Sequence, residues 1–253
     1  MRLTLLGTGT STGVPQVGCG CKVCRSADPR DRRLRCSALV DTDGGQRLLF
    51  DCGPDFRAQM LATDFRPIDA VFITHEHYDH IGGLDDLRPF SVFGQVDVYA
   101  EAPCAAHLRE RLPYCFVEHK YPGVPQIALH DVRLHEPVAV GGTEVVPVRV
   151  MHGRLPIVGY RVGRFAYLTD LSTLPEEEVS RLEGLDCLVV NALRHEPHPS
   201  HQSLAEALAL VERLRPRRAV LTHMSHGIGL HRDVEPQLPE NIYLGYDDLI
   251  MDC

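Results

Sequence analysis

The sequence predicts an α/β protein of the αββα type, in which two mixed β-sheets pack face to face and helices flank them. Three observations support this architecture. The 253-residue chain contains many short apolar runs of strand length, bounded by turn residues. Helical spacing of apolar residues is clearest at 204–214. The order of elements is a set of strands, a helix, and a second set of strands that ends in helix and strand.

The expected elements follow one another without a linker. Strands are expected at 2–6, 37–41, 47–51, 70–74, 96–100, 145–150, 157–162, 165–169, 187–191, 219–222 and 242–244. Helices are expected at 57–63, from 82 onward, at 175–182 with Pro at its start, and at 204–214. No low-complexity stretch or internal repeat divides the chain, so a single domain over 1–253 is expected.

Composition and charge restrict the function. The apolar and charged fractions, 44% and 24%, are ordinary for a globular enzyme. No apolar run is long enough to span a membrane and the first residues do not resemble a signal peptide, so a cytoplasmic location without a membrane partner is expected. A net charge of −8 argues against a general nucleic-acid binder. It does not exclude a small anionic substrate, because bound divalent metals reverse the local potential.

The motif HEHYDH, directly after the apolar run at 70–74, is the most informative segment. A buried strand ending there would deliver His75 and His77 to one metal while Asp79 and His80 face another. Imidazole and carboxylate are ligands of catalytic Zn²⁺ and also suit Mn²⁺ or Fe. Buried without a metal, several of these groups would lack hydrogen-bond partners. The motif therefore predicts the core of a two-metal hydrolase site.

Three further candidate ligands, His152, Asp170 and His223, each stand at or just beyond the C-terminal end of an apolar run. A two-metal site needs three or four protein ligands for each ion and open positions for water and substrate. Taken singly, Asp170 could cap a helix and His152 could be a surface histidine. Taken with the motif, the three complete a ligand set. Asp51, which closely follows a strand, is expected to orient one of the metal-binding imidazoles.

A second metal site is expected in the N-terminal loop, where Cys19, Cys21 and Cys24 form a compact C-x-C-x₂-C cluster. Thiolates select Zn²⁺ in closed tetrahedral sites, and His226, three residues after His223, is the best candidate for the fourth ligand. Such a structural zinc would join the loop to the edge of the active site. The alternative is three reduced thiols in a loop. The nine cysteines, an odd number, favour metal binding and buried thiols over disulfides.

The motif His-x-His-x-Asp-His and the order of the later ligands resemble the metallo-β-lactamase superfamily over nearly the whole chain. The resemblance implies the metallo-β-lactamase fold. It also implies two divalent metals in the active site, one held by His75, His77 and His152, the other by Asp79, His80 and His223, with Asp170 bridging them.

The Gly-Cys-x-Cys-x-x-Cys loop and the ending Thr-His-x-Ser-His are similar to one branch of that superfamily, the PhnP-type phosphoribosyl 1,2-cyclic phosphate phosphodiesterases. This likeness implies a cyclic sugar phosphodiester substrate, such as 5-phosphoribosyl 1,2-cyclic phosphate. It further implies hydrolysis by a hydroxide that bridges two metals, commonly Mn²⁺, and one structural Zn²⁺. The positive charge of two metals suits catalysis of phosphodiester cleavage.

The expected catalytic residues are His201 and Asp79. The leaving sugar oxygen needs a proton, which a histidine can supply. In the resembling family a histidine just ahead of the long helix occupies the acid position, and His201 matches it. Ser203 is well placed to cap that helix. His195 and His198 are expected to flank the site, with His195 a candidate support for a ligand.

Rival functions share parts of this pattern. A β-lactamase is disfavoured because no secretory signal is evident, and a glyoxalase-like thioesterase lacks the cysteine loop. A tRNA 3′-processing endonuclease normally carries an RNA-gripping arm, whereas the stretch 112–125 contains one lysine, Lys120. A non-catalytic metal-binding protein would show gaps among the active-site ligands, and there are none. Exposed strand edges in this superfamily often pair, so a homodimer is a further expectation.

Overall fold

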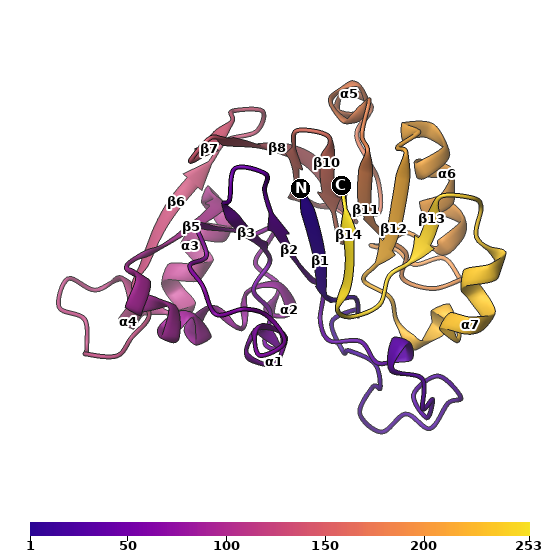
Figure 1. Cartoon of the computed structure of the whole chain (residues 1–253), viewed down its shortest axis with the longest axis horizontal. Helices are drawn as coiled ribbons and strands as arrows, with labels where there is room; N and C mark the ends of the chain where they lie inside the picture. The colour runs from indigo at the N-terminus through magenta and orange to yellow at the C-terminus, as the bar shows by residue number, and fades with distance from the viewer.

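The computed structural model describes residues 1–253 and contains two seven-stranded sheets (Figure 1). In spatial order, the first sheet consists of β14 (Leu249–Asp252), β1 (Arg2–Gly7), β2 (Ser37–Asp41), β3 (Arg47–Phe50), β4 (Ala70–Phe72), β5 (Val96–Glu101) and β6 (Ile127–Val132). The second consists of β13 (Ile242–Leu244), β12 (Arg218–Thr222), β11 (Cys187–Asn191), β10 (Phe165–Leu168), β9 (Leu155–Val162), β8 (Thr143–His152) and β7 (Val138–Val140). Both sheets contain parallel and antiparallel pairs, as predicted.

The helices are short apart from two. They are α1 (Phe56–Met60), α2 (Tyr78–Ile81), α3 (Ala102–Arg111), α4 (Pro113–Phe116), α5 (Glu176–Val179), α6 (Leu204–Leu214) and α7 (His231–Val234). Further 3₁₀ turns lie at Pro29–Asp31, Leu84–Phe93, Ser180–Leu182, His226–Ile228 and Glu235–Gln237. None of these helices combines the length and the apolar character that crossing a bilayer requires.

The buried residues form three layers that follow from strand alternation. In β3, Leu48 and Phe50 belong to the cluster between the two sheets, whereas Leu49 belongs to the cluster under α1 and α3. The ring of Phe50 lies 5.5 Å from that of Tyr167 and 5.8 Å from that of Tyr160, measured between centroids. These aromatic contacts join the facing sheets, as the αββα architecture requires.

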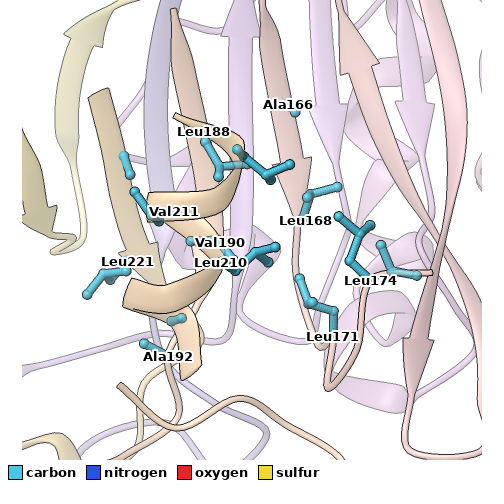
Figure 2. Packing of buried hydrophobic residues seen from close by; sticks show 14 of the residues in the cluster. Ala166, Leu168, Leu171, Leu174, Leu188, Val190, Ala192, Leu210, Val211 and Leu221 are labelled. Atoms are coloured by element: carbon cyan, nitrogen blue, oxygen red, sulfur yellow. The ribbon is translucent and has the colours of Figure 1, made fainter. Parts of the chain in front are cut away.

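The third layer lies between α6 and the second sheet. Figure 2 shows Leu210 and Val211 of α6 beside Leu188 and Val190 of β11 and Leu221 of β12, all of them buried. The apolar positions of α6 recur at helical spacing, which is why the sequence predicts this helix with its observed ends.

Ser203→Ala should lower the free energy of unfolding by about 1 kcal/mol, because Ser203 caps α6. Its hydroxyl accepts from the backbone N–H of Glu206, and the Glu206 carboxylate accepts from the backbone N–H of Ser203 at 2.8 Å. Urea unfolding measures the change, and Ser203→Thr, which keeps a hydroxyl, serves as the control. Equal loss in both variants would contradict the capping role.

The structure contains every predicted strand and corrects the helices at several points. The three strands that the sequence did not predict, β6, β7 and β14, all lie at sheet edges. An edge strand is partly exposed, so its apolar alternation is weak. Helix α3 was also missed, since it buries only Cys104, Ala105 and Leu108. The predicted helix at 175–182 divides into α5 and a 3₁₀ turn, and the one after Gly82 is a 3₁₀ helix.

Candidate functional site

The predicted ligand residues meet where strands of both sheets end. From the first sheet, the segment after β4 and helix α2 supply ligand residues. From the second sheet, the ends of β8, β10 and β12 supply them. The residues form two groups, and within each group the ligand atoms lie within 4.8 Å of one another. The first group is His75, His77 and His152, and the second is Asp79, His80, Asp170 and His223.

The buried carboxylate of Asp170 lies between the two groups. Its Oδ2 is 3.3 Å from Nε2 of His75 in the first group and 2.7 Å from Nε2 of His80 in the second. Its Oδ1 is 2.7 Å from Nε2 of His223. One carboxylate therefore reaches ligand atoms of both groups, in the place where a bridging ligand would lie.

The buried nitrogen and oxygen atoms of the site are arranged to bind a metal and not to hydrogen-bond with one another. Nε2 of His75, of His80 and of His223 are buried and have no hydrogen-bond partner, and the same is true of Oδ1 of Asp170. Two of these nitrogens are only 2.7 Å from Asp170 but lack the direction of a hydrogen bond. Four buried polar atoms without partners need an explanation, and a shared cation supplies one. Imidazole nitrogen and carboxylate oxygen fit Zn²⁺, Mn²⁺ or Fe.

Hydrogen bonds behind the rings fix which imidazole nitrogen faces the site. Nδ1 of His80 donates to Oδ2 of Asp51 at 2.7 Å, and Nδ1 of His152 donates to the carbonyl of Ser200 at 2.8 Å. With a proton on Nδ1, a neutral imidazole presents a free electron pair on Nε2. The structure thus places Asp51 where the sequence predicted an orienting carboxylate. Ser200 was missed because a backbone carbonyl leaves no signal in the sequence.

The charges of the second group are strongly coupled. Although burial opposes ionisation, the imidazoles of His223 and His80 hold the pKa of Asp170 well below its usual range. Burial likewise opposes charge on His223, yet Asp170 raises the pKa of that ring to about 10. By contrast, burial lowers the pKa of His75 well below its ordinary value. The carboxylates thus attract positive charge, and a metal that binds there displaces protons.

Three residues of the site have left-handed backbone conformations. Asp51, Asp170 and His223 have φ values of 60°, 57° and 54°, and each directly or closely follows a strand. Such values cost energy in residues other than Gly and collect at functional sites. Neighbouring hydrogen bonds hold the turn after Asp170, because the side chain of Asn191 accepts from N–H of Leu171 and donates to its carbonyl.

His201 lies at the mouth of the same site. Its ring centroid is 4.6 Å from that of His152 and 5.0 Å from that of His223. Nδ1 is buried and 3.5 Å from Oδ1 of Asp170, which leaves Nε2 as the nitrogen open to a bound substrate. Burial lowers the pKa of His201 to about 3, so the free imidazole is neutral. The negative charge of a bound phosphodiester acts in the opposite direction and favours protonation.

The other two histidines of this loop, His195 and His198, contact different parts of the molecule. The ring of His198 is 5.0 Å from that of His201, and its Nδ1 accepts from the backbone N–H of Ser200. His195 donates from Nε2 to the carbonyl of Ile228, in the 3₁₀ turn that begins at His226. His195 therefore contacts the segment beside the cysteine cluster and not the binuclear ligand set.

The structure also brings the three loop cysteines to His226. Sγ of Cys19 is 3.2 Å and Sγ of Cys24 is 3.4 Å from Nδ1 of His226, and Cys21 completes the group. No disulfide links any of the nine cysteines. The cluster joins the N-terminal loop to the segment just beyond β12, three residues from His223.

Comparisons with known proteins agree with this fold. A crystal structure of a new diphosphatase from the PhnP family superposes with a TM-score of 0.92 at 41% identity, covering 100% of this chain and 97% of that one. Zn²⁺-bound PqqB from Methylobacterium extorquens shares the fold, with a TM-score of 0.83 at 21% identity and complete coverage of both chains.

Sequence similarity extends to a longer protein. An octanoyltransferase of Porphyromonas gingivalis is 46% identical over 250 residues, 98% of this chain, and this chain spans about half the length of that relative, 51%. Residues 46–224 match the family described as the beta-lactamase superfamily domain. Since that match covers most of the chain and the two sheets have the corresponding arrangement, the chain belongs to the beta-lactamase superfamily, as a metallo-hydrolase fold close to a PhnP-family diphosphatase.

Proposed function

We propose that the protein is a binuclear metal-dependent phosphodiesterase that hydrolyses a cyclic sugar phosphodiester such as 5-phosphoribosyl 1,2-cyclic phosphate. The observation that carries the proposal is the position of Asp170, whose two oxygens lie within 3.3 Å of ligand nitrogens from both groups. A shared carboxylate holds two ions close enough to act on one phosphoryl group. Similarity to the PhnP-family diphosphatase supports a phosphoryl substrate.

The seven ligand residues fit two divalent ions, Mn²⁺ or Zn²⁺ or Fe, and the cysteine cluster fits one structural Zn²⁺. When bound, two active-site ions would activate water and offset the negative charge that develops on the phosphoryl oxygens. The chain's own contribution is to hold the ligand atoms. Asp51 and the Ser200 carbonyl fix two imidazoles with Nε2 inward, and Asp79 and Asp170 supply the negative charge that retains cations.

Proton transfer to the leaving sugar oxygen is assigned to His201. A sugar alkoxide is a poor leaving group, so a positioned acid contributes roughly 10²–10⁴-fold to the rate. Nδ1 of His201 is buried, whereas Nε2 is not and has no hydrogen-bond partner in the protein. Nε2 is therefore the atom from which the proton would move. Burial disfavours the protonated ring, whereas the charges of the substrate and of Asp170 favour it.

Turnover of a substrate panel by the metal-supplemented protein tests the proposal. The panel contains ribose 1,2-cyclic phosphate 5-phosphate, 2′,3′-cyclic nucleotides, an aryl phosphodiester, a dinucleoside diphosphate, lactoylglutathione, an octanoyl thioester and a precursor tRNA. Preference for the cyclic sugar phosphates is the expected result. Preference for the diphosphate would contradict the cyclic substrate and indicate a phosphoanhydride. The similarity to a diphosphatase, at 41% identity, is the observation that favours this second candidate. Turnover of a thioester or tRNA alone, or of nothing, would contradict the proposal.

His201→Ala should reduce turnover of the cyclic sugar phosphate by roughly 10²–10⁴-fold and leave bound metal unchanged. The loss should be much smaller with an aryl phosphodiester, because an acidic phenol leaves without protonation. Steady-state kinetics on both substrates and metal analysis measure these effects. His198→Ala, which removes a ring 5.0 Å away, is the matched control and should have the smaller effect. Equal losses on both substrates would remove the acid role of His201.

A further inference from the structure

Thr74 belongs to neither candidate metal group but contacts residues that belong to or support both. It follows β4, directly before His75, and is 2% exposed. Its Oγ1 lies 3.0 Å from Nδ1 of His75 and 3.0 Å from each carboxylate oxygen of Asp51. Asp51 in turn accepts from Nδ1 of His80 at 2.7 Å. One hydroxyl therefore connects a ligand of the first group with the carboxylate that orients a ligand of the second.

The direction of these hydrogen bonds follows from counting protons. The carboxylate of Asp51 can only accept, and the hydroxyl of Thr74 has one proton to give. If that proton went to His75, the hydroxyl oxygen would face two carboxylate oxygens at 3.0 Å with no proton between them. The hydroxyl must therefore donate to Asp51 and accept from Nδ1–H of His75. This arrangement leaves the electron pair of His75 on Nε2, the atom near Asp170.

We propose that the Thr74 hydroxyl relays the charge of Asp51 to His75, so that one buried carboxylate orients an imidazole in each of the two metal-binding groups. Thr74 is thus a positioning residue that couples both ions to a single charge. The inference rests on the metal-binding role proposed above. It goes further in assigning the orientation of His75 to a threonine that binds no metal itself.

The backbone makes Thr74→Val a selective test. The main-chain N–H of Thr74 donates to Oδ1 of Asp51 at 2.9 Å and stays in every variant, so Asp51 keeps its place. Valine has nearly the shape of threonine and lacks only the hydroxyl. Thr222→Val is the matched control, because Thr222 is also buried and directly precedes a ligand, His223, but its hydroxyl lies 3.3 Å from the thiol of Cys36.

Zn²⁺ titration against a chromophoric chelator measures the affinity of each group, in protein freed of active-site metal but with its cysteine cluster already loaded with zinc. The first group is measured in a His223→Ala background and the second in a His152→Ala background. Thr74→Val should weaken binding to the first group about 10–100-fold and change the second by less than about 3-fold. Thr74→Ser and Thr222→Val should bind normally. Asp51→Asn should weaken both groups.

Long-range ¹H–¹⁵N spectra of the metal-free protein give an independent result, since they distinguish a proton on Nδ1 from one on Nε2. The proton of His75 should be on Nδ1 in the natural protein and should be redistributed in Thr74→Val. Circular dichroism checks that each variant folds, and Thr74→Ala replaces the valine variant if it does not. Normal metal binding by Thr74→Val, equal weakening in Thr74→Ser, or an Asp51→Asn effect confined to the second group would overturn the relay. Metal binding by both groups without phosphodiester turnover would instead overturn the proposed function alone.

Discussion

Asp170→Asn should cut phosphodiester turnover by at least about 10²–10³-fold, the loss typical of removing one preorganised oxyanion-hole donor. The carboxylate lies 2.7 Å from ligand nitrogens of His80 and His223 and 3.3 Å from that of His75. An amide is uncharged and has one accepting oxygen, so it cannot supply both the oxygen near His75 and His80 and the oxygen near His223. Asparagine tolerates the left-handed conformation at this position, φ 57°, so the backbone can keep its path.

Turnover of an aryl phosphodiester and metal content per chain measure the effect. The expected variant is folded, binds fewer active-site ions and retains the structural zinc. Asp248→Asn is the matched control, because Asp248 also has a left-handed backbone, φ 66°, and carries a carboxylate outside both groups. Full activity in Asp170→Asn would show that no bridging carboxylate is needed and would contradict the two-ion proposal.

Cys21→Ser should release about one zinc ion per chain and lower the melting temperature. Removing one thiolate from a closed Cys₃His site destroys tetrahedral coordination, and zinc binding contributes directly to folding. If zinc is present at a hundred times its Kd, its loss costs about 2.7 kcal/mol. For a chain of this size that corresponds to roughly 5–11 °C. Elemental analysis and calorimetry of the purified variant provide the two measurements.

Cys253→Ser serves as the comparison, since Cys253 is a free thiol outside the cluster. It should keep its full zinc content. If Cys21→Ser also kept its zinc and its melting temperature, the three thiols would be ordinary loop cysteines. The proposed binuclear site would be unaffected by that result, because its ligands are imidazoles and carboxylates.

The sequence predicts the fold well where burial is complete and poorly where it is partial. The strand at 187–191 and the helix at 204–214 appear with their predicted ends, because their apolar patterns are set by neighbours on the faces that they bury. At the sheet edges, β6 exposes two of its six residues and half-buries two more. Half-exposed positions accept polar residues, so the pattern that identifies a strand is lost there.

For the site, the sequence predicted the ligand side chains better than the groups that support them. The HEHYDH motif and the resemblance to a known family predicted which side chains would meet, and the structure brings their ligand atoms together in two groups. The supports of those side chains were less visible. Thr74 and the carbonyl of Ser200 act through hydrogen bonds that depend on how strand ends meet in space. The left-handed conformations of Asp170 and His223 also have no local signal, because the surrounding contacts impose them.

The site is assembled from both sheets, so metal binding would stabilise the packing of one sheet on the other. His75 comes from the segment after β4 of the first sheet, whereas Asp170 and His223 follow strands of the second. An ion shared by these ligands binds only when the two sheets are docked, so binding and docking are linked equilibria. Each tenfold increase in free ion above the Kd would add about 1.4 kcal/mol to the cost of separating the sheets. The catalytic centre would then also act as a clamp, and chelators would lower the free energy needed to separate the two sheets.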